Sequence, residues 1–226
     1  MGDLKSLLYM TFIQEDRYKI FLDGLGNTLL LTFISFILGT AVGILLCWAV
    51  LSENTAVSKF FRKFRSFLME LPTMVLLMIF VYVVFGKSAM PVFWCVIAGL
   101  TLKAGAFLSD IFESGVNTVS PGEIEAARTL GMSRWQAFRY IVLPQTVSAA
   151  LPMYQSQFVS TMQETSVVGY LAVVDMTRAA SVVSSRTLDA VVGLVTVTVM
   201  YFIIGAVMKQ IFSLIVKRFH RGGETA

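Results

Sequence analysis

The feature that most constrains this chain is its set of long runs without a charged residue. Only 14% of its 226 residues are charged, whereas 56% are apolar. A helix needs about 20 mostly apolar residues to cross a bilayer, with roughly 17–25 tolerated. Three runs qualify directly, and two shorter ones can extend into amphipathic flanks. We therefore expect one all-α domain over residues 1–226, a polytopic membrane protein with five transmembrane helices around 24–52, 71–86, 88–102, 142–163 and 190–208.

Basic residues predict how these helices cross the membrane, because they collect on the cytoplasmic side. With the N-terminus outside and the C-terminus inside, eleven basic residues lie inside and six outside, and Lys103 falls within the third span. We expect this orientation, which explains the net charge of +4 without a nucleic-acid partner. The inside set is Lys59, Arg62, Lys63, Arg65, Arg128, Arg134, Arg139, Lys209, Lys217, Arg218 and Arg221, and the outside set is Lys5, Arg17, Lys19, Lys87, Arg178 and Arg186.

The flank ahead of the second run has the pattern of an amphipathic helix. Its apolar side follows Phe60, Phe64 and Phe67 at helical spacing, and Pro72 then starts the apolar run. We expect this helix to lie at the inner membrane interface, and a regulatory role is the alternative. Its basic side, expected to face lipid headgroups, consists of Lys59, Arg62, Lys63 and Arg65.

The fourth span is unusually polar. Ser156, Ser160 and Glu164 recur every four residues, so one helix face carries all three. Polar groups within a bilayer must face protein or water, and an ionisable group there costs about 2.5–3.5 kcal/mol on insertion scales. Glu164 and Lys103 of the third span are therefore candidate substrate-path residues, together with Ser156 and Ser160. A structural Lys103–Glu164 ion pair is the alternative, and helix packing is the simpler explanation for the hydroxyls.

Between the third and fourth spans lies a polar segment at about 119–144, predicted to be cytoplasmic. Ser120 and Glu123 have the spacing of a capping box, and the helix that they start should stop at Gly131. Ser133 begins a second such box, whose helix should end before Pro144. We expect two short helices joined at Gly131, the second resting on the membrane interface through Trp135, Phe138 and Val142.

The first of these helices has the features of a docking element. Ala126 and Ala127 offer only small side chains, which let another surface approach closely. Glu125 can pair with Arg128 on the next turn or with a cation on a partner. A simple cytoplasmic loop is the alternative, and these residues alone favour neither.

Motifs decide between the two. Glu125-Ala126-Ala127, then Gly131, then Ile141-x-Leu143-Pro144 resembles the EAA pattern of ABC importer permeases. Three further stretches resemble the polar amino-acid uptake permeases of that class: residues 24–32 (GLGNTLLLT), 106–112 (AFLSDIF) and 164–166 (ETS). Two departures from that pattern are residues 69–72, which keep only the proline of an R-G-T-P motif, and Lys103, where a smaller or neutral residue is expected.

The resemblance implies a permease subunit of an ATP-driven importer for amino acids in the bacterial inner membrane. It implies two partner ATPase subunits that carry ATP and Mg²⁺, a second permease that is identical or paralogous, and an extracytoplasmic binding protein that docks near 24–27 and 166–187. The chain itself would bind no cofactor. The residues expected to dock on the ATPase are Glu123, Glu125, Ala126, Ala127, Arg128 and Gly131.

Other classes of protein fit less well. A secondary amino-acid or ion transporter, acting without ATPases through Lys103 and Glu164, is the main alternative, but no inverted repeat is visible. A membrane scaffold leaves the motifs unexplained. An intramembrane enzyme lacks a catalytic or metal-binding set, since His220 is the sole histidine and Cys47 and Cys95 stand alone in apolar runs. No Walker motif or cleavable signal peptide is expected.

Overall fold

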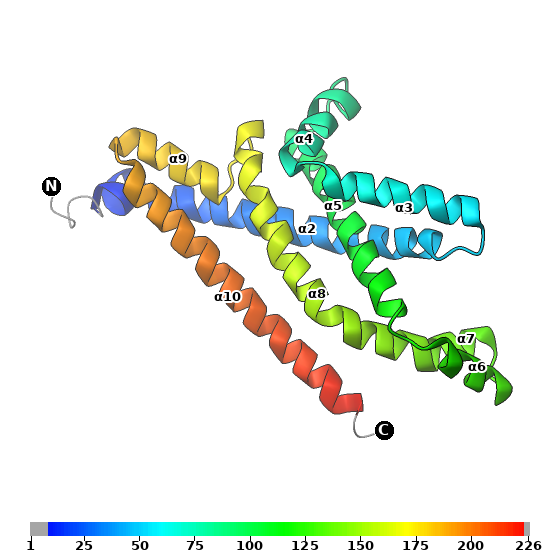
Figure 1. Ribbon diagram of the computed structural model, residues 1–226. Coiled ribbons are helices and arrows are strands. Elements are labelled where there is room, and N and C mark those ends of the chain that lie inside the picture. Colours follow the sequence, from blue (N-terminus) through cyan, green and yellow to red (C-terminus); the bar gives the residue numbers. More distant parts are fainter. Residues whose placement is uncertain (1–8, 224–226) are drawn as a thin grey trace. The chain divides into compact units, whose positions relative to one another are not determined.

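The computed structural model describes residues 9–223, with side chains through Leu214 (Figure 1). These residues form helices and no strand, so the all-α prediction is confirmed for them. Lys5 lies outside the described residues, as do the side chains of Lys217, Arg218, His220 and Arg221. The elements are η1 (Tyr9–Ile13), η2 (Gln14–Asp16), α2 (Tyr18–Val50), α3 (Thr55–Glu70), α4 (Thr73–Met78), η3 (Ile79–Val84), α5 (Val92–Val116), α6 (Pro121–Thr129), α7 (Arg134–Ala137), η4 (Phe138–Val142), α8 (Leu143–Glu164), η5 (Thr165–Leu171), α9 (Met176–Thr187) and α10 (Ala190–Gly223).

Three helices of the described chain are long and apolar enough to cross a membrane. They are α2, α5 and the Ala190–Leu214 part of α10. Two further pairs of helices meet that test only when each bent pair counts as one span: α3 with α4–η3, and residues 134–171 with α9. The structure thus supports between three and five spans.

The second predicted span is not one straight helix. α3 ends at Glu70, and Pro72 precedes α4 with an extended backbone (φ −57°, ψ 133°). Proline removes a backbone donor and disfavours a helical conformation in the residue before it, so the helix breaks here. The amphipathic flank and the apolar run therefore form separate helices.

The chain divides into two compact units. Unit 1 comprises the described residues of Met1–Phe36, Leu71–Thr101 and Val159–Met208. Unit 2 comprises Ile37–Glu70, Leu102–Phe158 and the described residues of Lys209–Ala226.

Unit 1 contains two apolar clusters. In the first, Leu31 of α2 packs with residues of α4, α5 and η5, including Leu77, Leu100 and Val168, all fully buried. In the second, α9 packs against the beginning of α2 and the beginning of α10, which lie beside it in Figure 1. Asp175 caps α9 by accepting hydrogen bonds from the backbone N–H groups of Thr177 and Arg178. The cap satisfies N–H groups that have no partner within their own helix.

The contact between α2 and α9 is close because of one glycine. A Cβ placed on Gly24 would lie 2.8 Å from the carbonyl oxygen of Asp175 and 2.9 Å from Cβ of Ala179. Two residues along the same helix, a Cβ on Gly26 would meet nothing within 4 Å. The two glycines of this motif therefore have different roles, and only Gly24 is required for packing.

Unit 2 is held together by aromatic and polar contacts between its helices. Phe158 of α8 lies 5.2 Å from Phe212 of α10, measured between ring centroids. Tyr154 contacts Phe112 of α5 and forms a 3.0 Å hydrogen bond with the hydroxyl of Thr40 in α2. These contacts join α2, α5, α8 and α10 within the unit.

The predicted helix from Ser133 to Pro144 is wrong at its C-terminal end. α7 runs through the π-helical turn η4 directly into α8, so residues 134–164 are helical throughout and Pro144 lies within the first turn of α8. Proline lacks an N–H and its ring clashes with the carbonyl four residues earlier. The π turn immediately before Pro144 changes the hydrogen-bond register there, and the helix continues.

We predict opposite effects for two small substitutions in α2. Gly24→Ala should destabilise unit 1 by about 1–3 kcal/mol, because its Cβ overlaps α9. Gly26→Ala should leave stability unchanged or raise it by about 0.5–1 kcal/mol, because alanine is the better helix former. The midpoint of thermal unfolding can be measured with a thiol-reactive fluorophore in a Cys47→Ala background. The dye then labels Cys95, which is buried in unit 1 until the unit unfolds. Equal midpoints for the two variants would contradict the assigned contact.

Candidate functional site

The first helix of the 119–144 segment ends in a complete Schellman motif. The N–H of Met132 donates to the carbonyl of Ala127, and the N–H of Gly131 donates to that of Arg128, each at 3.1 Å. Gly131 has φ +88°, a left-handed conformation that glycine adopts without a steric penalty. The predicted stop at Gly131 is confirmed, and the glycine is required by the backbone.

The two predicted capping boxes have different outcomes. The box at Ser133 is confirmed: its hydroxyl accepts from the N–H of Gln136, whose side chain accepts from the N–H of Ser133. The box at Ser120 is wrong, because the Ser120 side chain makes no capping hydrogen bond. The Glu123 carboxylate instead accepts a 2.6 Å hydrogen bond from Nε2 of Gln145 in α8. Glu123 thus ties α6 to the start of α8.

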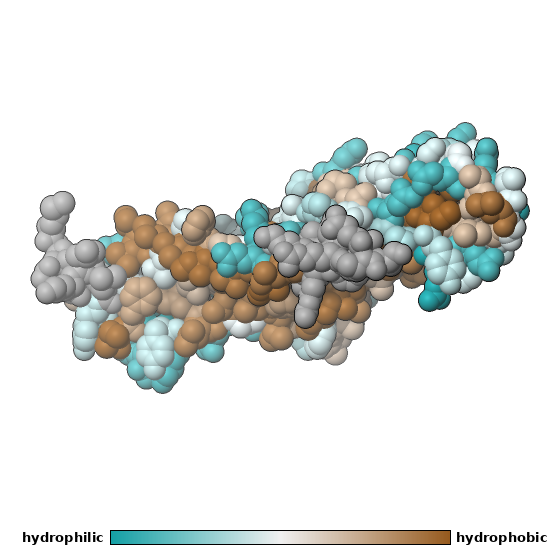
Figure 2. Space-filling model, turned by 90° about the horizontal axis from the view of Figure 1, so that it is seen from below, coloured by the Kyte–Doolittle hydropathy of each residue, from teal (hydrophilic) through white to brown (hydrophobic). Residues whose placement is uncertain are grey.

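The candidate docking residues do not all face outward. Glu125, Ala126 and Arg128 are exposed, and so is Glu123. Ala127 is only 3% exposed, so its methyl group packs against its own chain. This corrects the expectation that both alanines present a small surface to a partner. In Figure 2 the region of α6 and α7 shows hydrophilic residues interspersed with hydrophobic ones.

A second loop of unit 2 reaches this segment. Arg134, the first residue of α7, forms a 3.2 Å ion pair with Glu53 in the loop between α2 and α3. Asn54 next to it caps α3, its side-chain oxygen accepting from the N–H groups of Ala56 and Val57. Sequence reasoning missed this proximity, which joins residues about 80 positions apart.

A buried ion cluster joins α3 to α5 near the end of α5. Arg65 lies 2.6 Å from Glu113 and 3.1 Å from Asp110, and the side chains of Arg65 and Glu113 are less than a tenth exposed. Arg62 approaches the same Glu113 at 2.7 Å from a half-exposed position. The expectation that Arg65 faces lipid headgroups is therefore wrong, whereas Arg62 is half exposed and also pairs with Glu113. The sequence did contain an indication of this cluster. Arg62 and Arg65 are three residues apart and share one helix face, and Asp110 and Glu113 share a face in the same way.

The candidate substrate-path residues are distributed over both units. In unit 2, Lys103 is buried at 4% exposure, whereas Ser156 is exposed and donates to the carbonyl of Pro152. In unit 1, Ser160 and Glu164 are half-buried. Burial of an ionisable side chain such as Lys103 in an apolar helix is costly and supports a specific role for it.

The motif at residues 24–32 lies against the segment before α9, within unit 1. Asn27 donates to the carbonyl of Val174 at 2.8 Å, and the buried Thr28 hydroxyl accepts from the N–H of Met176 at 3.1 Å. The resemblance implied a binding protein that docks near both 24–27 and 166–187, and these contacts bring the two stretches together within unit 1.

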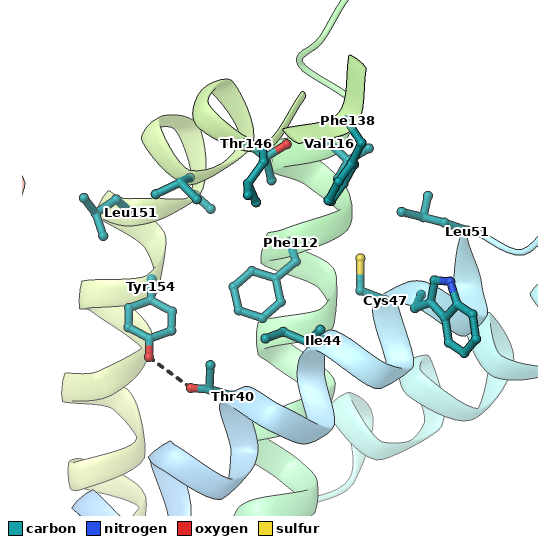
Figure 3. Close-up of a pocket in the computed structure, with 14 residues that line it drawn as sticks. Thr40, Ile44, Cys47, Leu51, Phe112, Val116, Phe138, Thr146, Leu151 and Tyr154 are labelled. Carbon is teal, nitrogen blue, oxygen red and sulfur yellow. Dashed lines mark hydrogen bonds between the residues drawn. The ribbon is translucent and has the colours of Figure 1, made fainter. Parts of the chain in front are cut away.

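Unit 2 also contains a cavity of about 500 Å³ (Figure 3). Its walls come from the end of α2, the end of α5 and the η4–α8 region, with Phe112 and Tyr154 pointing into it. No charged side chain lines it. An amino acid, with its ammonium and carboxylate groups, is therefore not expected to bind here. Among the side chains that the structure describes, in residues 9–214, no group of His, Cys, Asp or Glu has the arrangement of a metal site.

Comparisons with known proteins agree with this arrangement. Residues 35–221 match the family described as "Binding-protein-dependent transport system inner membrane component". A probable amino-acid ABC transporter permease protein, YckA of Bacillus subtilis (strain 168), is 25% identical over 216 residues and 94% of each chain. The glutamate/aspartate import permease protein GltK of Escherichia coli O157:H7 is 28% identical, covering 87% of this chain and 92% of its own. The crystal structure of an amino acid ABC transporter with histidines contains a chain with a TM-score of 0.83 and 25% identity, covering 96% of this chain and 99% of that one.

The family match spans most of the chain, so the chain belongs to the binding-protein-dependent transport system inner membrane components. It is the membrane permease subunit of an ABC importer, as the motifs predicted. The comparisons favour this assignment over the secondary transporter.

We predict that the ion cluster contributes to the stability of unit 2. Glu113→Gln leaves the buried Arg65 guanidinium without its closest partner, which should cost about 3 kcal/mol. Arg62→Gln, the matched control, removes a half-exposed partner of the same carboxylate and should cost under about 1 kcal/mol. Labelling of Cys47 during heating, in a Cys95→Ala background, reports unfolding of this unit. Equal losses in the two variants would argue against a special role for burial.

Proposed function

We propose that this chain forms part of the path by which a bacterial importer carries amino acids across the plasma membrane. The substrate class is supported by relatives that are named as amino-acid permeases and that match this chain over nearly their whole length. A second permease subunit, identical or paralogous, completes the path, and two ATPase subunits bind ATP and Mg²⁺. The single domain 1–226 crosses the membrane five times, with its N-terminus outside and its C-terminus inside. The excess of basic residues in the segments then placed inside supports this orientation.

In this proposal the 119–144 segment receives the ATPase on the cytoplasmic side. The observation that carries it is the form of α6: a nine-residue helix closed by a Schellman motif at Gly131, with Glu125, Ala126 and Arg128 exposed. Two residues of α6 hold it against the rest of the chain. Ala127 is buried, and Glu123 accepts a hydrogen bond from Gln145 of α8. A helix fixed at both ends moves as a rigid body when a partner moves it.

On the opposite side, an extracytoplasmic binding protein delivers the amino acid. The surface where Asn27 meets Val174, next to the capped start of α9, is the proposed contact. Its backbone is held by the buried hydrogen bond from the N–H of Met176 to Thr28, which favours a fixed docking surface over a loop that orders on binding.

The experiment that tests the coupling role replaces Gly131 by valine. At φ +88° a β-branched residue is strained by about 1–3 kcal/mol, so the end of α6 should unwind. Uptake driven by ATP should fall by about tenfold for each 1.4 kcal/mol of strain, while the chain still inserts. Gly131→Asn, which tolerates the left-handed conformation, and Gly122→Ala in the same helix are the controls and should keep most of the activity. Normal ATP-dependent uptake by Gly131→Val would contradict the role of the segment.

A separate experiment tests the path itself. Lys103→Met and Glu164→Gln each remove one charge that could meet the carboxylate or the ammonium group of an amino acid. We expect either change to raise the Kd or the half-saturating substrate concentration, or to alter the choice of amino acid, in purified transporter with normal expression. Collapse of expression in both variants, with unaltered binding in what remains, would instead indicate a structural ion pair.

A further inference from the structure

The cavity of unit 2 offers a ligand almost no polar partner. The hydroxyls of Thr40 and Tyr154, two of its wall residues, are hydrogen-bonded to each other at 3.0 Å, as Figure 3 shows. The surface that the walls present is almost entirely apolar. A buried water needs about two to four polar partners, so ordered water is not expected to fill this space.

The size of the cavity is that of a binding site for a small molecule. Its volume of about 500 Å³ lies within the range of such sites, roughly 300–1,000 Å³. Voids larger than a water molecule are rare in a packed protein interior. Because the walls of an unfilled space lose dispersion contacts, these walls favour an apolar occupant.

The cavity lies where three membrane helices end or begin on one side. Leu51 directly follows α2, Val116 ends α5, Leu143 begins α8, and all three line the cavity. In the proposed orientation α2 and α5 run from outside to inside and α8 runs back. The three residues then lie at the cytoplasmic end of their helices, next to the inner lipid leaflet.

The cavity also reaches the surface of unit 2. Two wall residues of α2, Ile44 and Trp48, are 57% and 78% exposed. Tryptophan is enriched where membrane helices meet the interface, and Trp48 lies two residues before the end of α2. Lipid tails are as apolar as these side chains, so a tail that enters gains contacts with a concave wall and crosses no polar layer.

A cation lies next to the wall in the sequence. Arg139 directly follows the wall residue Phe138 and is exposed. Its side chain forms no ion pair or hydrogen bond within the part of the chain that the structure describes. Basic residues at the cytoplasmic leaflet attract anionic lipids. An apolar cavity with a cation beside it complements a molecule that joins an apolar chain to an anionic group.

We propose that the cavity binds one acyl chain of an anionic phospholipid from the cytoplasmic leaflet, and that the lipid phosphate lies beside Arg139. The bound chain contacts the 119–144 segment through Phe138, whose ring stacks on Trp135 with 5.7 Å between centroids. This inference rests on the proposed function, because the proposed orientation defines the leaflet.

The first test uses the purified complete transporter in nanodiscs. Their lipid includes phosphatidylglycerol that carries a diazirine at the end of one acyl chain, and mass spectrometry identifies the residues labelled by light. We expect adducts on Phe112 and Tyr154, which point into the cavity in Figure 3. Adducts on the outer helix faces alone would mean that protein fills the cavity, and would overturn the proposal.

A matched pair of variants separates the cavity from the outer surface. Val147→Trp adds a large ring to a wall residue that is 39% exposed, and adducts on Phe112 and Tyr154 should be lost. Val57→Trp adds the same ring to α3 of the same unit, at a residue that is 37% exposed and not part of the wall, and should leave these adducts unchanged. Equal labelling of the two variants would refute the site.

A further variant guards against impaired folding. Val147→Ala widens the cavity without adding bulk, so the adducts on its walls should remain. Their loss in Val147→Ala as well as in Val147→Trp would show that labelling does not depend on the space in the cavity, and would contradict the proposal.

The last test concerns the headgroup. Arg139→Gln should reduce labelling by the anionic probe about fivefold and leave labelling by a phosphatidylcholine probe unchanged. Lys87→Gln removes an exposed cation from the loop before α5, on the other side in the proposed orientation, and should change neither. Unaltered anionic labelling of Arg139→Gln would overturn the phosphate contact.

These measurements follow lipid and not transport, so the two proposals can fail separately. Normal ATP-dependent uptake with unlabelled cavity walls refutes the lipid site and leaves the proposed function standing. Labelled walls in a transporter that imports no amino acid do the reverse.

Discussion

Polar groups within an apolar helix bundle need partners from the protein, and this requirement shapes both units. In unit 1 the buried hydroxyl of Thr28 accepts the N–H of Met176, and the fully buried Asp175 is used to cap α9. In unit 2 the buried Arg65 is surrounded by Glu113 and Asp110. Leaving such groups without partners costs several kcal/mol in a bilayer. The Thr28 and Arg65 contacts therefore fix the relative positions of helices, whereas the Asp175 cap stabilises the start of α9.

The ion cluster also connects two features that are distant in sequence. α3 begins at the Asn54 cap, beside Glu53, and α5 ends shortly before α6. Arg65 and Arg62 bind the last turns of α5 through Glu113, while Arg134 reaches back to Glu53. Within unit 2, the 119–144 segment is thus attached to the loop before α3 through Arg134 and Glu53, while α5, which precedes the segment, is attached to α3 itself. The contacts of this region with its neighbours therefore include ion pairs between residues distant in sequence, and not only the chain connection itself.

The sequence predicted what depends on local rules. The all-helical class, the Gly131 stop and the Ser133 capping box follow from composition and from residues a few positions apart, and the structure agrees. The Ser120 box failed because Gln145, a residue of another helix, competes for the Glu123 carboxylate. The assignment of Arg65 to the lipid face failed for a similar reason, since its partners lie far away in the sequence. Amphipathic spacing within one helix cannot show that carboxylates of another helix lie next to it. Ala127 illustrates a third limit, since a small side chain suits a partner's surface and its own chain equally well.

The π turn at Phe138–Val142 has a geometric consequence for the residues on either side of it. An unbroken α-helix places positions 135, 138 and 142 in one stripe, because 3.6 residues complete a turn. One residue gained in a wider turn rotates everything before it by about 100° relative to everything after it. Val142 therefore points into the protein while the indole of Trp135 points outward. The continuous helical stretch 134–164 thus buries a side chain at the end of the π turn and exposes one before it, although the sequence spacing places both on one face.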